Sequence, residues 1–260
     1  MKLITLNTWG GRAGKKLLLD FFDKHKDVDV FCLQEIWSAP YEHLEGQVAG
    51  GVAISHEQVM TRGKQEISEV LKDHSSYFRP LVLNDYGLLM LVRNNLTVKE
   101  EGEVYVYKHK GYVAEGDIGD HGRALQYLTV NLKDGPLTII NFHGLWAPEF
   151  KSNPYSKIDT ADRISQSKRI VEFTKTLTND FILCGDFNLL PDTESIAILE
   201  RAGLKNLIKD YGVTSTRNSF YNKTEEKHAD YIFVSEVIDV KDFKVLPEEV
   251  SDHSALLLEI

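Results

Sequence analysis

The stretch from Asp180 to Asn188 constrains the fold of this chain more than any other. The apolar run from Asp180 to Cys184 predicts a buried strand, and Gly185 permits a bend or a close backbone approach where the run stops. Asp186 and Asn188 follow two residues apart, and the period of a strand would turn both side chains the same way. A carboxylate and a carboxamide could therefore converge on one point, although an ordinary turn would read the same.

Strand-like segments recur along the rest of the chain and often follow one another directly. They are residues 2–7, 28–33, 77–83, 88–93, 96–107, 124–132, 137–143, 229–234, 243–246 and 255–260. Apolar residues at helical spacing predict helices over 15–25, 56–74, 160–177 and 193–202, and 37–51 reads as a loop. This order predicts an α/β (α+β) architecture, with two mostly antiparallel sheets packed face to face and helices on the outside. No repeat or linker interrupts it, so we expect one domain over residues 1–260.

The net charge of −9 argues against binding a polyanion by charge alone, because non-specific nucleic-acid binding normally needs a basic surplus. Cys32 and Cys184 both lie inside apolar runs, which indicates buried thiols. The apolar start of the chain is too short for a signal peptide, and no run reaches the roughly 20 apolar residues of a membrane helix. We therefore expect a cytoplasmic monomer with no membrane span.

Polar residues whose side chains could take part in catalysis or metal binding lie at the ends of six predicted strands. These residues are Asn7, Glu35, His143, Asp186 with Asn188, Asp230, and Asp252 with His253. Each one alone would be unremarkable, because acids at strand ends are usually solvated. Their order along the whole chain is the informative observation.

That order resembles the endonuclease/exonuclease/phosphatase superfamily, which contains deoxyribonuclease I, exonuclease III, neutral sphingomyelinases and inositol-polyphosphate phosphatases. The matching stretches are Leu6-Asn7-Thr8-Trp9, Leu33-Gln34-Glu35, Asn141-Phe142-His143, Gly185-Asp186-Phe187-Asn188, Asp230-Tyr231-Ile232 and Ser251-Asp252-His253. The resemblance covers nearly the whole chain. It implies a four-layer α/β sandwich and hydrolysis of a phosphate ester with the help of a divalent metal.

The resemblance also implies a role for each residue. Glu35 would bind Mg²⁺ or Mn²⁺, with Asn7 and Asp252 nearby, because hard cations prefer oxygen ligands. Asp186 would activate the attacking water, and Asn188 would donate to the developing charge on phosphorus. The remaining implied roles are that Asp230 orients His253 and that His253 and His143 donate to phosphate oxygens.

Weaker candidates lie beside these residues. Arg123 could reach a phosphate, although a surface salt bridge is an equally good interpretation. Asp85 or Tyr86 could support His143. The tryptophans could stack on a base or wall an apolar pocket, or could simply pack; they are Trp9, Trp37 and Trp146.

The substrate remains open at this point. His143, and the run His228-Ala229-Asp230-Tyr231, differ from the pattern of exonuclease III-type apurinic endonucleases, which argues against abasic-site repair. We expect a phosphate-ester substrate, possibly a nucleic acid, and favour a nuclease-like phosphodiesterase. The alternatives are a phosphomonoesterase of a small metabolite or headgroup, and an inactive family member that serves as a binding module.

Overall fold

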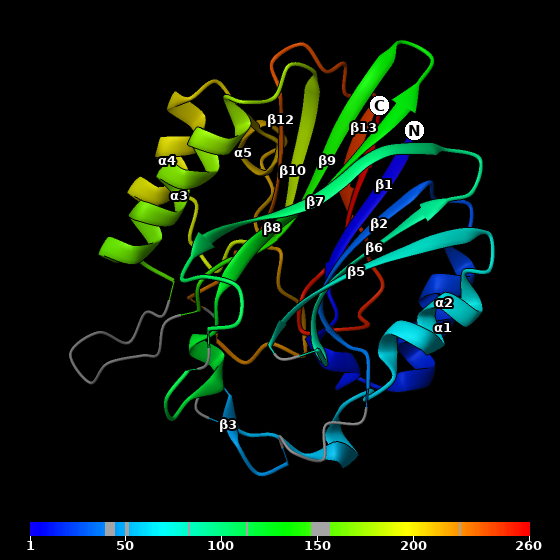
Figure 1. Cartoon of the computed structure of the whole chain (residues 1–260), viewed down its shortest axis with the longest axis vertical. Coiled ribbons are helices and arrows are strands. Elements are labelled where there is room, and N and C mark those ends of the chain that lie inside the picture. The colour runs from blue at the N-terminus through cyan, green and yellow to red at the C-terminus, as the bar shows by residue number, and fades with distance from the viewer. Residues whose placement is uncertain (40–44, 50–51, 83, 113, 147–156, 224) are drawn as a thin grey trace.

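Two six-stranded sheets pack face to face in the computed structural model, which describes residues 1–39, 45–49, 52–82, 84–112, 114–146, 157–223 and 225–260 (Figure 1). The first sheet has the order β13 (Asp242–Val245), β14 (Leu256–Glu259), β1 (Lys2–Asn7), β2 (Val30–Trp37), β6 (Tyr86–Arg93), β5 (His74–Val82). The second has the order β11 (Lys205–Asn206), β12 (Asp230–Val234), β10 (Asp180–Asp186), β9 (Gly135–His143), β8 (Arg123–Leu132), β7 (Thr97–Tyr107). Among the described strands of these two sheets, β1–β2 and β9–β10 pair in parallel and the other neighbours are antiparallel, so the prediction of mostly antiparallel sheets is confirmed.

Helices cover the outer faces of both sheets (Figure 1). On the side of the first sheet lie α1 (Lys15–Lys24) and α2 (Gly63–Val70), and on the side of the second lie α3 (Ala161–Thr174), α4 (Glu194–Arg201) and α5 (Leu207–Asp210). Thr160 caps the N-terminus of α3, since its hydroxyl accepts a hydrogen bond from the Arg163 amide. None of the helices in the described ranges is long and apolar enough to cross a membrane.

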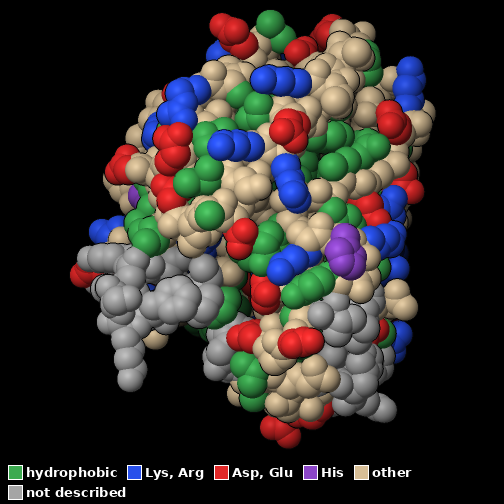
Figure 2. All heavy atoms as spheres, turned by 60° about the vertical axis from the view of Figure 1, so that its left-hand side comes forward, with side chains coloured by type: hydrophobic (Ala, Val, Ile, Leu, Met, Phe, Trp, Pro, Cys, Tyr) green, Lys and Arg blue, Asp and Glu red, His purple; other side chains and the backbone are tan. Residues whose placement is uncertain are grey.

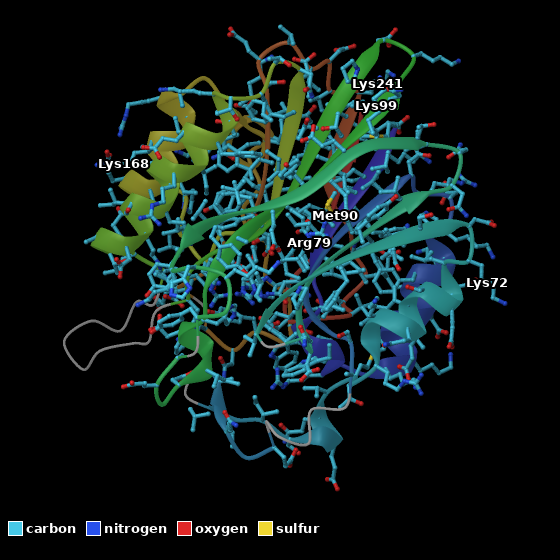
Figure 3. The ribbon with its side chains drawn as sticks, viewed as in Figure 1. Lys72, Arg79, Met90, Lys99, Lys168 and Lys241 are labelled. Atoms are coloured by element: carbon cyan, nitrogen blue, oxygen red, sulfur yellow. The ribbon has the colours of Figure 1, made fainter. Side chains whose placement is uncertain are left out.

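Charged side chains of both signs alternate over the face in Figure 2, without a continuous basic track. The interior is apolar instead. Side chains fill the space between the sheets, with Met90 near the centre and Lys72 and Lys168 at the periphery (Figure 3). Met90 is fully buried, as are Cys32 and Cys184, which confirms that both thiols lie in the core.

Two sequence predictions of secondary structure are corrected. The helix predicted over 56–74 is instead the 3-10 turn η3 (His56–Gln58), the shorter α2, and the start of β5 at His74. The segment 37–51, expected to be a loop, contains β3 (Val48–Ala49), which pairs with β4 (Val52–Ala53); residues 40–44 and 50–51 lie outside the described part. Two short elements, β11 and α5, were not predicted, because elements of two to four residues leave no periodic pattern.

Strand pairing brings the polar strand ends to one edge of the sandwich. In the first sheet, Asn7 of β1 lies opposite Gln34 of the parallel β2. In the second sheet, Asp186 of β10 lies opposite His143 of the parallel β9 on one side and opposite Asp230 of the antiparallel β12 on the other. The Asn7 side chain donates a hydrogen bond to Asp186 at 2.8 Å, so the two sheets meet at this edge.

A bulge in β2 changes the direction of Glu35. The pairing of β2 with β6 shifts register between Leu33 and Ile36, and Glu35 has a φ of 60°. In a regular strand Gln34 and Glu35 would point to opposite faces. The bulge lets Gln34 donate to Asn141 between the sheets at 2.7 Å while Glu35 accepts from Asn7 at 3.0 Å.

Gly185 should tolerate no side chain. Its φ is 136°, and an added Cβ would lie 2.0 Å from the Phe142 carbonyl oxygen. We expect Gly185→Ala to lower the free energy of unfolding by about 3 kcal/mol or more. Gly203→Ala is the matched control, because Gly203 has a φ of 91° with open space around it, and it should cost about 1 kcal/mol. Equal urea midpoints for the two variants would contradict the packing described for β10.

Candidate active site

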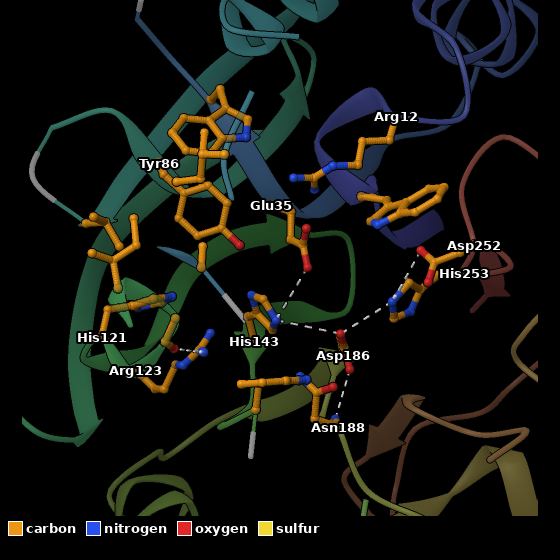
Figure 4. Close-up of a pocket in the computed structure, with 18 of the residues that line it drawn as sticks. Arg12, Glu35, Tyr86, His121, Arg123, His143, Asp186, Asn188, Asp252 and His253 are labelled. Atoms are coloured by element: carbon orange, nitrogen blue, oxygen red, sulfur yellow. Dashed lines mark hydrogen bonds and ion pairs between the residues drawn. The ribbon is translucent and has the colours of Figure 1, made fainter. Parts of the chain in front are cut away.

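A cavity of about 450 Å³ opens at the edge where the strand ends meet (Figure 4). Every residue of the predicted site except Asn7 and Asp230 lines it directly. Those lining residues are Glu35, His143, Asp186, Asn188, Asp252, His253, Arg123, Trp9, Trp37 and Trp146. Asn7 and Asp230 lie just behind this surface and contact its residues.

The Asn7 amide joins the two carboxylates at the centre. Its Nδ2 donates to Glu35 Oε1 at 3.0 Å and to Asp186 Oδ2 at 2.8 Å. Its Oδ1 accepts the backbone N–H of Trp9 at 2.9 Å, so every polar group of the amide is used. The side chain of Asn7 therefore fixes how far apart Glu35 and Asp186 lie.

His253 and Asp230 form a buried pair. The ring Nδ1 donates to both Asp230 oxygens at 2.9 Å, and Thr216 donates to the same carboxylate at 2.9 Å. The ring Nε2 therefore faces Asp186 Oδ2, at 3.6 Å. Burial and Arg217 act to lower the pKa of His253, but the surrounding carboxylates outweigh them and raise it.

Asp186 is ionised at neutral pH. Burial alone would raise the pKa of its carboxyl group, but the nearby His253 and His143 and the Asn7 hydrogen bond hold it well below its usual range. His143 behaves differently, since burial and the charge of Arg123 lower its pKa to about 3. Its Nε2 lies 3.7 Å from Asp186 Oδ2 and 3.9 Å from Glu35 Oε1, so a neutral imidazole sits between two carboxylates.

Two groups of oxygen and nitrogen atoms could hold a metal ion. Asp186, Asp230 and His253 each offer one ligand atom, and these atoms lie within 4.8 Å of one another. However, Nδ1 of His253 is already bound to Asp230. The second group is the pair Glu35 and Asp186, which shares one amide and, among the described residues, has no lysine or arginine in direct ion-pair contact. Burial raises the pKa of Glu35 against the effects of Asn7 and Arg12, as expected for a carboxylate that lacks a close cation.

Backbone strain gathers around this cavity. Four non-glycine residues in the described ranges have a positive φ, and three of them line the cavity, namely Trp9 (51°), Glu35 (60°) and Asn188 (55°). Asn188 is thus no longer in strand geometry, which corrects the expectation that a strand turns its side chain the same way as that of Asp186. Its backbone N–H donates to Asp186 Oδ1 at 2.8 Å, and its side chain donates to the Gly144 carbonyl at 3.3 Å. Such strain persists where the surrounding structure fixes a functional geometry.

Arg123 is not on the surface. It is 2% exposed, lines the cavity, and donates from Nη2 to the Gly119 carbonyl at 2.9 Å, while its Nε and Nη1 have no partner in the described structure. The interpretation of Arg123 as a surface salt bridge is therefore wrong. Tyr86 also lines the cavity and packs against Trp37 with 4.9 Å between ring centroids, whereas Asp85 is not a lining residue.

Several other lining residues are not predicted by the sequence analysis. They are Arg12, His121, Lys157, Arg217, Tyr221 and Lys223. All of them except Arg12 lie in segments without periodic apolar pattern, and Arg12 ends the 3-10 turn η1 (Trp9–Gly11).

Comparison with known proteins agrees with the resemblance noted above. The sequence profile of the Endonuclease/Exonuclease/phosphatase family matches residues 4–253. No curated protein sequence matches significantly. Among solved structures, a mannosyl-6-phosphatase of Bacteroides thetaiotaomicron is similar at 19% identity and a TM-score of 0.70, over 100% of this chain and 98% of that one. An endonuclease/exonuclease/phosphatase of Bacteroides vulgatus matches at 18% identity and 0.70, over 99% and 97%. A humanized D. rerio TDP2 matches at 14% and 0.65, over 99% and 97%.

The pairing of His253 with Asp230 makes a prediction for the metal-free protein. Asp230→Asn removes one of the charges that stabilise the protonated ring, so the pKa of His253 should fall. An NMR titration of the His253 ring measures it. Asp242→Asn, at an exposed acid paired with Lys244, should leave the titration unchanged. An unaltered His253 pKa in Asp230→Asn would rule out the pair.

Proposed function

Because the chain belongs to the endonuclease/exonuclease/phosphatase family, a family of phosphoesterases, we propose that it is a divalent-metal-dependent hydrolase of small phosphate esters. One observation carries the proposal. A single amide, that of Asn7, holds the Glu35 and Asp186 carboxylates side by side at the wall of a cavity, and no lysine or arginine of the described ranges forms an ion pair with either carboxylate. Two such carboxylates need a cation, and their hard oxygen atoms suit Mg²⁺ or Mn²⁺.

Glu35 is the metal ligand in this proposal, and Asp252 at the same cavity wall is a second candidate. When bound, the metal would polarise a phosphoryl oxygen and lower the pKa of a bound water. Asn7 turns its nitrogen to the carboxylates and its oxygen to the Trp9 amide, so it acts as a positioning residue. Asp230 orients the His253 ring through its hydrogen bond to Nδ1 and is not a metal ligand in this proposal.

The remaining residues orient water and stabilise charge. Asp186, kept ionised, accepts a hydrogen bond from the attacking water and can take its proton. His253, held in one tautomer by Asp230, presents Nε2 to the phosphoryl oxygens. Neutral His143 donates a hydrogen bond, and Asn188 adds an amide donor. These groups are fixed before substrate binds, which is what charge stabilisation in phosphoryl transfer requires.

The charge of the cavity favours a phosphomonoester. Its basic lining residues outnumber its acidic ones, with Arg12, Arg123, Lys157, Arg217 and Lys223 against Glu35, Asp186 and Asp252. A bound divalent metal would increase this surplus. A monoester carries about −1.5 to −2 charges at neutral pH, more than a diester, and so matches the cavity better.

A nuclease-like phosphodiesterase, the activity favoured from sequence, is the second candidate. The observation that supports it is the presence of Trp9, Trp37 and Trp146 on the cavity wall, where aromatic rings could stack on bases. A long duplex would require a basic track beside the cavity, and the face in Figure 2 shows none.

Removal of the metal should abolish hydrolysis. We expect the protein to cleave p-nitrophenyl phosphate faster than bis(p-nitrophenyl) phosphate, EDTA to stop both reactions, and Mg²⁺ or Mn²⁺ to restore them. Faster cleavage of the diester, or of single-stranded DNA, would favour the second candidate. Activity that survives chelation would contradict metal dependence. Inactivity on every ester with metal present would favour the alternative that the protein is an inactive family member that serves as a binding module.

Asp186→Asn and His253→Ala should each lower kcat by at least about 10²-fold, because each removes a group that acts in the transition state. Circular dichroism checks that both variants fold. Asp242→Asn, the same chemical change at an exposed acid, should keep wild-type kcat. A folded Asp186→Asn enzyme with wild-type turnover would exclude Asp186 from catalysis.

A further inference from the structure

Two cations lie against the ring of Tyr221 at the cavity wall. Lys157 Nζ is 4.6 Å from the ring centroid, and the Arg217 guanidinium carbon is 4.2 Å from it. Lys157 is 3% exposed and the Arg217 side chain 7%. All three residues line the cavity, and their side chains form what we call the Tyr221 wall.

Glu226 holds this wall in place without neutralising Lys157. Its Oε1 accepts the backbone N–H of Lys157 at 3.1 Å, and its Oε2 accepts the Tyr221 hydroxyl at 3.0 Å and lies 3.8 Å from Lys223 Nζ. The ammonium group of Lys157 instead donates to the Glu226 backbone carbonyl at 3.4 Å. Within the described part of the chain, it forms no ion pair with a carboxylate.

Arg217 also keeps donor capacity. Its Nη1 donates to Asp252 Oδ2 at 2.6 Å, while its buried Nε has no partner among the described residues. Burial and the charge of Arg217 lower the pKa of Lys157 to about 8. Two cations on one ring, both removed from water, repel each other, and a bound anion would relieve that repulsion.

The Tyr221 wall adjoins the centre that would hold the reacting phosphoryl group. The Arg217 backbone forms an isolated antiparallel bridge with His253, and its guanidinium reaches the centre through Asp252, whose Oδ1 lies 3.8 Å from His253 Nε2. Arg123, the other buried arginine of the cavity, lies across Asp186 from Asp252 in Figure 4. An anion at the wall would therefore sit to one side of the scissile phosphate.

We propose that Lys157, Arg217 and Tyr221 bind a second anionic group, a phosphate or carboxylate, carried by the leaving group of the substrate. This inference rests on the proposed function and narrows its substrate class to small phosphate esters with two anionic groups. The aromatic ring spaces the two cations, and Glu226 fixes the ring and the Lys157 backbone, so the subsite is formed before substrate binds.

A matched pair of substrates tests the proposal. Glycerol 3-phosphate and 3-phosphoglycerate differ by one carboxylate at the end remote from the phosphate. We expect kcat/KM to be at least about tenfold higher for 3-phosphoglycerate, the size of one charge-assisted hydrogen bond. Lys157→Gln should bring the ratio close to one, and Lys157→Arg should preserve it.

Lys108→Gln is the matched control. Lys108 also lies over tyrosine rings, those of Tyr107 and Tyr112, but it is exposed and does not line the cavity. The control should keep the wild-type ratio. A wild-type ratio near one overturns the proposal. An equal loss on both substrates in a folded Lys157→Gln variant does so too, because Lys157 would then contact the reacting phosphate.

Calorimetry separates failure of the subsite from failure of the proposed function. Binding of the two compounds is measured to Asp186→Asn in the presence of Mg²⁺. Suppose that the wild type hydrolyses neither compound. Tighter binding of 3-phosphoglycerate than of glycerol 3-phosphate, and loss of that difference when Lys157→Gln is added, would then support the subsite although the proposed hydrolase function fails. Equal binding of the two compounds overturns the subsite whatever the activity.

Discussion

The hydrogen bonds of one buried amide, that of Asn7, hold the candidate active site together. They join Glu35 of the first sheet to Asp186 of the second, and one layer deeper Gln34 donates to Asn141 across the same interface. A buried amide without partners costs about 1–3 kcal/mol, so these contacts favour a single register between the sheets. The packing of the two sheets, rather than any loop, therefore sets the distance between the two carboxylates.

That the strand-end residues lie close together could be predicted, because it follows from the order of the strands in the two sheets. Parallel pairing of β1 with β2 and of β9 with β10 puts their carboxyl ends at one edge, and each apolar run shows where its strand stops. The bulge at Glu35 could not be predicted, since it depends on the pairing of β2 with β6. Asn188 lines the cavity, but a turn with positive φ brings it there rather than the strand period that would turn it the same way as Asp186.

The cationic part of the cavity could not be foreseen from sequence. Lys157, Arg217 and Tyr221 come from irregular segments, and they meet only because Glu226 receives hydrogen bonds from two of them. The sequence left a phosphate contact and a surface salt bridge equally open for Arg123, and only the tertiary structure shows that it is buried at the cavity wall. Residues that approach a site through tertiary contacts leave no local pattern, and they are the ones that would determine which ester is cleaved.

The central claim is that Glu35 binds the divalent metal while Asp230 orients the His253 ring. An anomalous difference map from crystals grown with Mn²⁺ tests it most directly. The account predicts a peak at about 2–2.3 Å from a Glu35 oxygen, with the Asp230–His253 hydrogen bond intact. A peak bound between Asp230 and His253, or no peak beside Glu35 at saturating Mn²⁺, would contradict it.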